Sequence, residues 1–546
     1  MYRYFGALCV SFSIVACQYE YTPVSSDGRF IPSGNAWYSE GERSIRDQQA
    51  YLAQTGVRPS QAKNVILFVG DGMSLGTIAA ARILDGQRQG MTGEEHQLSF
   101  EQFPFTGLSK TYNVDAQTPD SAGTMTAMTT GVKTDMGIVA QTEAAVRGVC
   151  DAAGEADVPT LLELAEIAGL SSGIVTTARL THATPAATYA HAPDRNWEDI
   201  SDLPEEAVAA GCRDIAAQFV GFADNISKKY GVSVDGPEVA FGGGRRHFLP
   251  ADSQFNSPDA QSSIEGDRTD GRHLIDEWKL AYPSGTYVMD TAGFASVSAQ
   301  SATPVLGLFS ESHMRYESDR PNDTSGEPDL IAMTEKAIQL LSRNEKGFFL
   351  MVEAGRIDHA HHAGNAYNAL NETVMLSEAV RRAQELTNPQ DTLIIVTSDH
   401  GHVMTFAGYP KRGNPILGKV ISPGEETLAE AADGLPYTTL SYANGMGMSE
   451  TDSDDPDNRY DLALNTGRHD ISEMDTESPH YHQEALVPLY SETHSGEDVA
   501  IYGNGPGSEF VTGVHEQNDI FHIINASLRL TEKASARLPP RTDISQ

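Results

Sequence analysis

From residue 64 onwards, short apolar runs alternate with longer amphipathic stretches. The four clearest runs are residues 65–69, 173–177, 348–352 and 392–396. A strand that is buried on both faces reads as a nearly continuous apolar or β-branched run, whereas amphipathic stretches at helical spacing predict helices. The alternation predicts an α/β fold with a central, mostly parallel sheet and helices on both faces.

Two short helices are predicted from their caps. Residues 160–168 have helical spacing and stop before Gly169, a residue type that commonly follows a helix C-terminus. A second helix is expected to begin at or just after Ser121 and to end near Gly131. Its N-terminal dipole would favour a serine alkoxide and a bound phosphate. The local sequence by itself, however, favours Asp120 or Ser121 as a simple cap.

The apolar pattern also divides the chain into regions. Residues 1–17 are predicted to be a signal peptide, and residues 18–62 a polar N-terminal arm with a helical patch at 44–53. Residues 63–405 form the predicted α/β catalytic domain. The stretch 406–484 is richer in Gly, Asp and Ser, which indicates an inserted crown-like subdomain, and residues 485–546 return to the catalytic domain.

The N-terminal segment predicts export. It carries Arg3 and then an apolar stretch at 5–16, which is too short to cross a membrane comfortably. The stretch ends in Ile-Val-Ala before Cys17, which resembles the site at which bacterial lipoproteins are cleaved and acylated. The protein is then an exported, periplasmic or outer-membrane-anchored lipoprotein with its lipid on Cys17. Conventional cleavage near Ala16 without a lipid is the alternative.

Export predicts a role for each of the four cysteines. Cys9 would leave with the signal peptide and Cys17 is the candidate lipid site, so Cys150 and Cys212 remain as an even pair in an oxidising compartment. We expect them to form a disulfide. A loop of about sixty residues closed in this way contributes roughly 3–4 kcal/mol in the chain-entropy model.

The charge balance narrows the range of partners. There are 75 Asp and Glu residues against 38 Lys and Arg residues, a formal net charge of −37. Such a surface repels a polyanion, so no nucleic-acid-binding surface is expected. A solvated acidic surface is typical of proteins that stay soluble in high salt, which indicates a halophilic protein. Accumulation of cations near metal sites is compatible with the same charge.

Acids and histidines follow the four apolar runs closely. In a doubly wound sheet the ligand site lies outside the carboxyl ends of the strands, so these residues are expected to meet in one place. They are Asp71; His182 and Thr184; Glu353 and Asp358; and Asp399 and His400. Asp358 and His362 are four residues apart, so on a helix they share one face and could bind one zinc ion. The chain has no Walker-type loop, HExxH helix or Gly-x-Ser-x-Gly elbow.

Six segments carry a specific resemblance. Residues 64–73, 119–124, 181–185, 352–359, 397–400 and 492–499 resemble the successive signature segments of alkaline phosphatases, in the order of that family. The likeness extends from about residue 63 to residue 522.

The resemblance implies a site with two zinc ions and one magnesium ion. One zinc would be held by Asp358, His362 and His494, and the second by Asp71, Asp399 and His400, with Ser121 as the nucleophile beside it. Magnesium would be held by Asp71, Thr184 and Glu353. Arg195 occupies the spacing of the arginine that clamps the phosphate. The positions of Cys150 and Cys212 match a disulfide of the animal-type members.

The resemblance is to the animal-type members of the family in particular. His182 and His359 are histidines as in the animal-type enzymes, where many bacterial members have Asp and Lys; together with Asp120 they would surround the substrate and the metals. A neutral imidazole in place of a carboxylate predicts weaker magnesium binding. Some animal-type members carry a fourth, calcium-like site with a Phe-Glu pair. Here the pair is Phe309-Ser310, so that metal is not assigned.

The function implied by the resemblance is the hydrolysis of small phosphate monoesters, with broad specificity, through a phosphoserine intermediate. Family members are usually homodimers. A phosphodiesterase or sulfatase of the same superfamily is an alternative. It is disfavoured because residues 121–125 lack the Pro and Arg of a sulfatase, and because phosphodiesterase relatives generally use Thr. A non-catalytic, exported metal- or phosphate-binding protein would have no need of Ser121 and Arg195.

Overall fold

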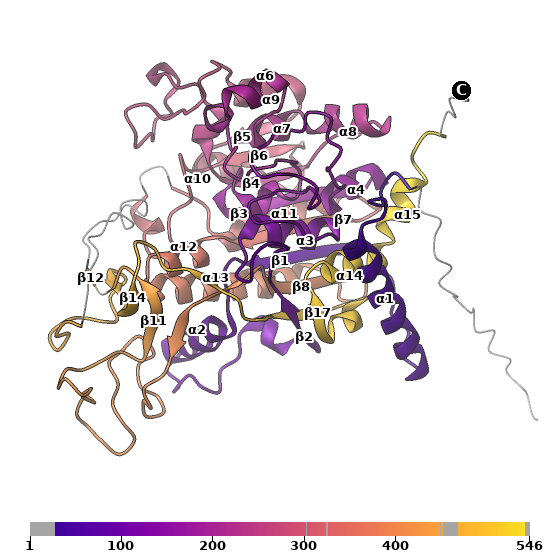
Figure 1. Ribbon diagram of the computed structural model, residues 1–546. Coiled ribbons are helices and arrows are strands. Elements are labelled where there is room, and N and C mark those ends of the chain that lie inside the picture. Colours follow the sequence, from indigo (N-terminus) through magenta and orange to yellow (C-terminus); the bar gives the residue numbers. More distant parts are fainter. Residues whose placement is uncertain (1–27, 302, 324–325, 448, 451–467, 541–546) are drawn as a thin grey trace, which may run out of the picture.

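The fold is built on one ten-stranded sheet, shown in a computed structural model that describes residues 28–301, 303–323, 326–447, 449–450 and 468–540 (Figure 1). The strand order is β17-β2-β16-β8-β1-β7-β3-β4-β6-β5. The strands are β1 (Asn64–Gly70), β2 (Phe105–Lys110), β3 (Ser171–Arg179), β4 (Val239–Gly243), β5 (Thr286–Val288), β6 (Val305–Leu308), β7 (Phe348–Ala354), β8 (Thr392–Ser398), β16 (Val499–Asn504) and β17 (Gly513–Glu516). All pairs are parallel except those of β16, which runs antiparallel to β2 and β8. The predicted α/β fold is confirmed.

The central strands are apolar over most of their length because both of their faces are covered. In β1 the side chains of Val65, Leu67 and Val69 belong to one hydrophobic cluster, and those of Ile66 and Phe68 to another. Successive side chains of a strand point to opposite faces. Burial of a side chain of this size contributes about 1.5–3 kcal/mol. The same alternation in the neighbouring strands builds two cores, one on each face of the sheet.

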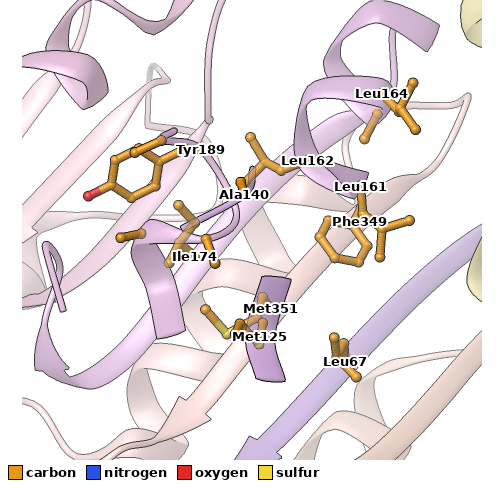
Figure 2. Close-up of a cluster of buried hydrophobic side chains, with 14 of the residues drawn as sticks. Leu67, Met125, Ala140, Leu161, Leu162, Leu164, Ile174, Tyr189, Phe349 and Met351 are labelled. Carbon is orange, nitrogen blue, oxygen red and sulfur yellow. The ribbon is translucent and has the colours of Figure 1, made fainter. Parts of the chain in front are cut away.

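Different helices cover the two faces. One face carries α2 (Leu75–Arg88), α11 (Leu330–Leu341) and α13 (Ala366–Leu386), which supply the second cluster. The other face carries α3 (Ser121–Thr130), α4 (Leu161–Ala168), α14 (Asp519–Leu528) and α15 (Leu530–Ser535). Figure 2 shows part of this second core, where Met125 of α3 and Leu161 of α4 lie over Met351, Phe349 and Leu67 of the sheet.

Both helices predicted from caps are confirmed. Helix α3 begins at Ser121 after the N-cap Asp120, whose side chain accepts a hydrogen bond from the backbone N–H of Gly123, and it ends at the left-handed Gly131. Helix α4 begins after Thr160 and ends at the left-handed Gly169. The cap of α3 therefore sets the orientation of the helix whose first residue is the predicted nucleophile.

The N-terminal arm contains a longer helix than predicted. Helix α1 spans Ala36–Gln54, whereas the sequence indicated a helical patch at 44–53. Its first turn is capped by Asn35, and the ring of Tyr38 packs 4.7 Å from that of His522 and 5.8 Å from that of Phe521 on α14. These tertiary contacts, which have no local signature, extend the helix toward its N-terminus.

The predicted insertion forms small separate sheets beside the main one. Strands β10 (Met404–Phe406), β11 (Leu440–Gly445) and β14 (Ala485–Pro488) form a three-stranded sheet. It includes residues on both sides of the 406–484 interval. Two further pairs join β12 (Ser449–Glu450) to β13 (Tyr481–His482) and β9 (Gly401–His402) to β15 (His494–Ser495). The last pair brings two histidines from distant parts of the chain together.

The upper lobe of Figure 1 contains α6 (Glu205–Ala210), α7 (Ile215–Val220), α8 (Phe222–Tyr230) and α9 (Leu274–Ala281). The other short helices are α5 (Ala183–Ala186), α10 (Thr291–Ser296) and α12 (Arg356–His362), and 3₁₀ turns lie at Ser99–Gln102, Ile200–Asp202, Arg245–Phe248, Ser253–Phe255, Arg320–Asn322 and Ser508–Val511. A disulfide joins Cys150 to Cys212, as predicted, across a sequence separation of 62.

The predicted signal peptide and the lipid site Cys17 lie outside the described residues. Within residues 28–540, as far as the structure describes them, no helix combines the length and the apolar character needed to cross a membrane.

Candidate active site

The sheet brings the predicted residues to one edge. Strands β8, β1, β7 and β3 are consecutive neighbours and parallel, so their carboxyl ends lie side by side. In register, Gly70 of β1 faces Ser398 of β8 and Ala354 of β7. The residues that follow, including Asp71 and Asp399, therefore emerge together. This is the place in a parallel sheet where ligands bind.

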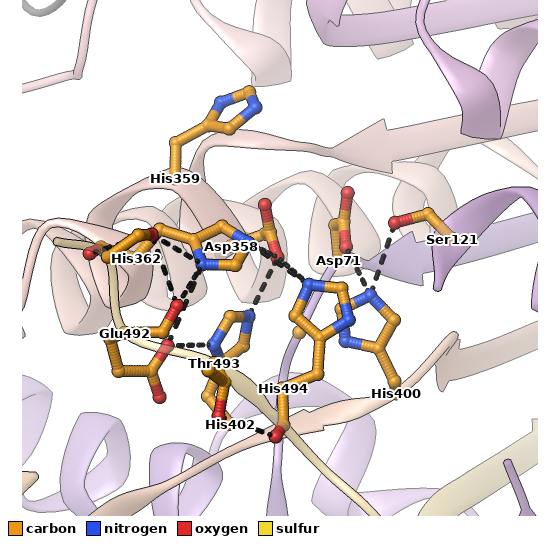
Figure 3. Close-up of polar contacts among 12 residues, drawn as sticks. Asp71, Ser121, Asp358, His359, His362, His400, His402, Glu492, Thr493 and His494 are labelled. Atoms are coloured by element: carbon orange, nitrogen blue, oxygen red, sulfur yellow. Dashed lines mark hydrogen bonds and ion pairs between the residues drawn. The ribbon is translucent and has the colours of Figure 1, made fainter. Parts of the chain in front are cut away.

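A first group of donors consists of Asp358, His362 and His494. Asp358 and His362 lie one turn apart on α12, and His494 comes from β15 (Figure 3). The Nε2 atoms of both histidines lie 3.3 Å from Oδ1 of Asp358, and 3.0 Å from each other. Two ligands of a tetrahedral zinc ion with bonds of about 2.0–2.1 Å are roughly 3.4 Å apart. The three donor atoms thus fit around one zinc ion.

Both histidines of this group are oriented by backbone carbonyls. Nδ1 of His362 donates to the carbonyl oxygen of Glu492 at 2.6 Å, and Nδ1 of His494 donates to that of Pro119 at 2.8 Å. A metal-ligating histidine usually donates its other ring N–H in this way. The arrangement leaves the two Nε2 lone pairs for a shared ion. Burial lowers the pKa of His362 to about 4, which keeps the ring neutral.

A second group surrounds Nε2 of His400. This atom lies 3.1 Å from Oγ of Ser121, 3.2 Å from Oδ2 of Asp399 and 3.5 Å from Oδ1 of Asp71. All four residues are buried, and Figure 3 shows Ser121 joined to the His400 ring. Burial and the neighbouring His494 hold the pKa of His400 well below its usual value. The separations again match the spacing of ligands around one zinc ion.

A third group consists of oxygen atoms alone. Oδ2 of Asp71, Oγ1 of Thr184 and Oε1 of Glu353 are buried and have no hydrogen-bond partner. Buried polar atoms without partners are costly, so three of them in one set of residues indicate a missing ligand. Oxygen donors are those that magnesium prefers. Burial raises the pKa of Glu353 to about 7, and burial together with the charge of Asp399 raises that of Asp71. A cation would relieve this excess of buried negative charge.

Arg195 is held by Asp120, the residue that precedes the predicted nucleophile Ser121. Its Nη1 donates to Oδ2 of Asp120 at 3.0 Å, and its Nη2 lies 3.1 Å from Nε2 of His182. The other oxygen of Asp120 accepts from the backbone N–H groups of Gly123 and Gly137. Burial alone would raise the pKa of Asp120, but Arg195 and these donors lower it overall. Asp120 is therefore both the helix cap and an anchor for the guanidinium.

His182 and His359 belong to a group of three rings. The His359 ring lies 5.5 Å from that of His182 and 4.0 Å from that of His313. Burial holds the pKa of all three far below the ordinary value, to about 3 for His182. One donor atom each of His182, Asp71 and Glu353 lie within 4.8 Å of one another. His182 thus borders the third group, whereas His359 points away from the zinc donors in Figure 3.

The sequence reasoning missed a buried pair behind the first group. His402 donates from Nε2 to Oδ1 of Asp358 at 2.7 Å, and its Nδ1 lies 2.5 Å from Oε2 of Glu492. Burial disfavours the charged ring, but Glu492 and Asp358 outweigh it and raise the pKa of His402 to about 10. His402 follows the Asp399-His400 pair by two residues, and this closeness was the one available signal. His313 had no such signal.

The family model "Alkaline phosphatase" matches residues 62–530. The chain is 40% identical over 491 residues to the tissue-nonspecific alkaline phosphatase of Rattus norvegicus, covering 89% of this chain and 87% of the relative. It is 40% identical over 495 residues to the alkaline phosphatase of Gadus morhua, covering 90% and 96%.

Solved structures show the same fold. Alkaline phosphatase from Thermus thermophilus superimposes with a TM-score of 0.58 at 24% identity, covering 88% of this chain and 96% of that one. The enzyme from the Antarctic bacterium TAB5 gives a TM-score of 0.55 at 22% identity, covering 86% and 99%. The resemblance first noted in six short segments thus extends over nearly all of the described fold. The chain belongs to the alkaline phosphatase family, and it is an enzyme with the phosphomonoesterase activity of that family.

Proposed function

We propose that this enzyme hydrolyses a broad range of phosphate monoesters through a phosphoserine intermediate on Ser121, at a site with two zinc ions and one magnesium ion. One observation carries the proposal. Three sets of donors, most of them buried, lie near Ser121, two with the separations of zinc ligands and one made of three unpartnered oxygen atoms. A helix cap alone would need none of them.

The donor sets assign the ions to residues. The first zinc would be held by Asp358, His362 and His494. The second would be held by Asp71, Asp399 and His400, and magnesium by Asp71, Thr184 and Glu353. When bound, the ions would lower the pKa of a hydroxyl or a water molecule and neutralise charge on the phosphate and on the departing oxygen.

The chain's own residues carry out the transfer. The Oγ atom of Ser121 gives its proton to solvent and attacks phosphorus, so that an Oγ–P bond forms as the bond to the alcohol oxygen breaks. The departing oxygen takes up a proton from solvent and leaves as the alcohol. Ser121 is the first residue of α3, so the helix dipole stabilises negative charge on Oγ and on the phosphate. Arg195, anchored by Asp120, donates hydrogen bonds to two phosphate oxygens and fixes their orientation.

The second half returns the enzyme to its starting state. A water molecule attacks phosphorus from the side that the alcohol has left, the Oγ–P bond breaks, and Ser121 recovers a proton. Inorganic phosphate then leaves. The side chains of Arg195, His362 and His494 retain 19%, 25% and 13% exposure, while Ser121 is buried. These exposed edges mark the face by which substrate reaches Ser121, and the alcohol group remains toward solvent.

The test compares the wild type with Ser121→Ala on an aryl phosphate at alkaline pH, before and after chelation. We expect at least about a thousandfold loss in the variant, because a covalent step has no substitute nucleophile. Ser527→Ala is the matched control, since Ser527 is a buried helical serine of α14 whose hydroxyl donates to the carbonyl oxygen of Ile523 in the same helix. Full activity in Ser121→Ala, or after chelation, would refute the mechanism. Faster turnover of a phosphodiester or a sulfate ester would favour the alternative superfamily activities.

The same proposal extends to the third ion. His182 borders the magnesium oxygens, where a carboxylate would add negative charge. We therefore propose that magnesium is the most weakly held ion. His182→Asp should tighten magnesium binding, measured by the magnesium concentration needed for half-maximal activity of the zinc-loaded enzyme. An unchanged or higher concentration would contradict this.

We also propose that the protein is exported and anchored by a lipid on Cys17, and that two copies associate. Mass spectrometry of the mature N-terminus tests the first proposal: any first residue other than an acylated Cys17 contradicts it. Light scattering tests the second. Leu486 and Tyr490, which are 83% and 79% exposed in and beside β14, offer a surface to perturb.

The charge of −37 further supports adaptation to high salt, and equal stability in low and multimolar salt would argue against it.

A further inference from the structure

A second cluster of potential metal ligands lies outside the catalytic groups. His247 is in the 3₁₀ turn Arg245–Phe248 that follows β4, Asp199 precedes the turn Ile200–Asp202, and Asp267 lies in a loop. One donor atom of each residue lies within 4.8 Å of the other two. The mechanism uses none of the three.

The histidine of this cluster is oriented as a metal ligand. Its Nδ1 pairs with Oδ2 of Asp199 at 2.6 Å, whereas its Nε2 is buried and forms no hydrogen bond. His247 is 7% exposed and Asp199 1%. Histidines that bind a metal through one ring nitrogen commonly donate the other N–H to a carboxylate. A buried Nε2 that forms no hydrogen bond leaves its lone pair available to bind a metal ion.

The oxygen nearest to Nε2 does not satisfy it. Oε2 of Glu198 lies 3.2 Å away without forming a hydrogen bond. That carboxylate already accepts bonds from the guanidinium of Arg179 and from the hydroxyl of Thr181. A separation of 3.2 Å is close to the roughly 3.4 Å between two ligands of one tetrahedral ion.

The local charges leave negative charge to be neutralised. Glu198 is paired with Arg179. Arg246 lies 3.4 Å from Glu311 and 3.9 Å from Asp267, so its pair with Asp267 is the looser of the two. Asp267 therefore has only a loose pair with Arg246, and among the described residues Asp199 is bonded by His247 and Ser201 without an Arg or Lys of its own. Burial raises the pKa of Asp267, although His247 and Arg246 partly offset this effect. The Asp267 side chain is 42% exposed, which gives an ion a route from solvent.

We propose that His247, Asp199 and Asp267 form an additional divalent-metal site, with Glu198 beside it. An imidazole among carboxylates favours Zn²⁺ or a similar transition ion, because Ca²⁺ and Mg²⁺ prefer oxygen donors alone. The site shares no donor with the three catalytic groups. The site is connected to His313 through Glu198 and Arg179. An ion here would therefore restrain the side chains that contact the group of three rings.

Two measurements on the full-length protein test the proposal without reference to activity. The first is anomalous scattering at the zinc edge from crystals grown with Zn²⁺. A peak bounded by His247, Asp199 and Asp267 is expected. Its absence, with the catalytic groups occupied, would overturn the proposal and leave His247 as a partner of Asp199 and Glu198 alone.

The second measurement is zinc content after saturation and removal of free metal. His247→Gln and Asp267→Asn should each hold one zinc equivalent per chain less than the wild type. The control is His96→Gln, because His96 also pairs at 2.6 Å with one carboxylate, Asp85, but is outside any such cluster of the described residues. Asp267 is partly exposed, so Asp267→Asn keeps the test valid if His247→Gln fails to fold. Equal zinc content in wild type and Asp267→Asn would overturn the proposal, whatever the outcome for the phosphatase mechanism.

Discussion

Arg195 is the residue whose removal should reveal most about the site. Its fork of five N–H groups engages Asp120 through Nη1 and faces His182 through Nη2, which leaves other N–H groups of the same fork for phosphate. Two charge-assisted hydrogen bonds at about 1.5–3 kcal/mol each amount to roughly 3–6 kcal/mol. At about 1.4 kcal/mol per factor of ten, Arg195→Ala should lower kcat/KM by roughly 10²–10⁴.

The anchoring by Asp120 makes a sharper test. Asp120→Asn keeps an oxygen that can accept from Gly123 and Gly137, so the cap of α3 is preserved. It removes the negative charge that holds the guanidinium. We expect kcat/KM to fall by about tenfold to a hundredfold, the equivalent of one charge-assisted bond. Arg195→Lys should be little more active than Arg195→Ala, because an ammonium group cannot make a bidentate contact with two phosphate oxygens.

The assay is a double-mutant cycle on kcat/KM for an aryl phosphate. If Asp120 acts by positioning Arg195, Asp120→Asn should have almost no effect in the Arg195→Ala background. Inhibition by inorganic phosphate gives an independent readout, because both variants should bind phosphate more weakly. Circular dichroism and thermal unfolding verify that α3 is intact. Fully additive losses, or unchanged phosphate inhibition in Arg195→Ala, would refute the reasoning.

Three further predictions concern stability and metal retention. Burial raises the pKa of Glu372 from its ordinary 4.5 to about 8, so the folded state holds a proton that the unfolded state loses and stability falls as the pH rises from 4.5 to 8. Glu372→Gln should therefore match the wild type near pH 4.5 but be more stable at pH 9, by at most about 5 kcal/mol in denaturant titrations; equal stability at pH 9 would contradict this. His402→Gln should hold zinc about 10–100-fold more weakly in chelator competition, and unchanged retention would show that its bond to Asp358 is dispensable. Replacing Cys150 and Cys212 together by Ser should cost about 4 kcal/mol of unfolding free energy, and a loss below about 1 kcal/mol would show that the closed loop is not what stabilises this lobe.

Much of the fold could be predicted because its strands are buried on both faces. Runs such as 65–69 and 393–396 are apolar on every residue, which distinguishes them from amphipathic helices and surface strands. The acids after them were visible for the same reason, since a carboxylate directly after a buried strand stands out. The helix cap at Asp120 and the pair on α12 depended only on local spacing.

What the sequence did not reveal depends on contacts between distant segments. The extent of α1 follows from the packing of Tyr38 against α14. His402 and Glu492 are 90 residues apart and meet only because β9 pairs with β15. No local pattern marks His247, whose partners lie 48 and 20 residues away along the chain. Each of these groups gains its role from a neighbour that periodicity and spacing do not identify.

The N-terminus of α3 shows how the two kinds of information combine. From the sequence, Asp120 was either a cap or part of a catalytic site, and local reasoning favoured the cap. The structure shows the cap together with a second contact: one carboxylate oxygen accepts from Gly123 and Gly137, and the other holds Arg195. The bonds that end the helix backbone therefore also fix the guanidinium relative to Ser121. Because both oxygens are committed, Asp120 cannot move without disturbing the start of α3, and the proposed phosphate clamp is held by the same side chain as the cap.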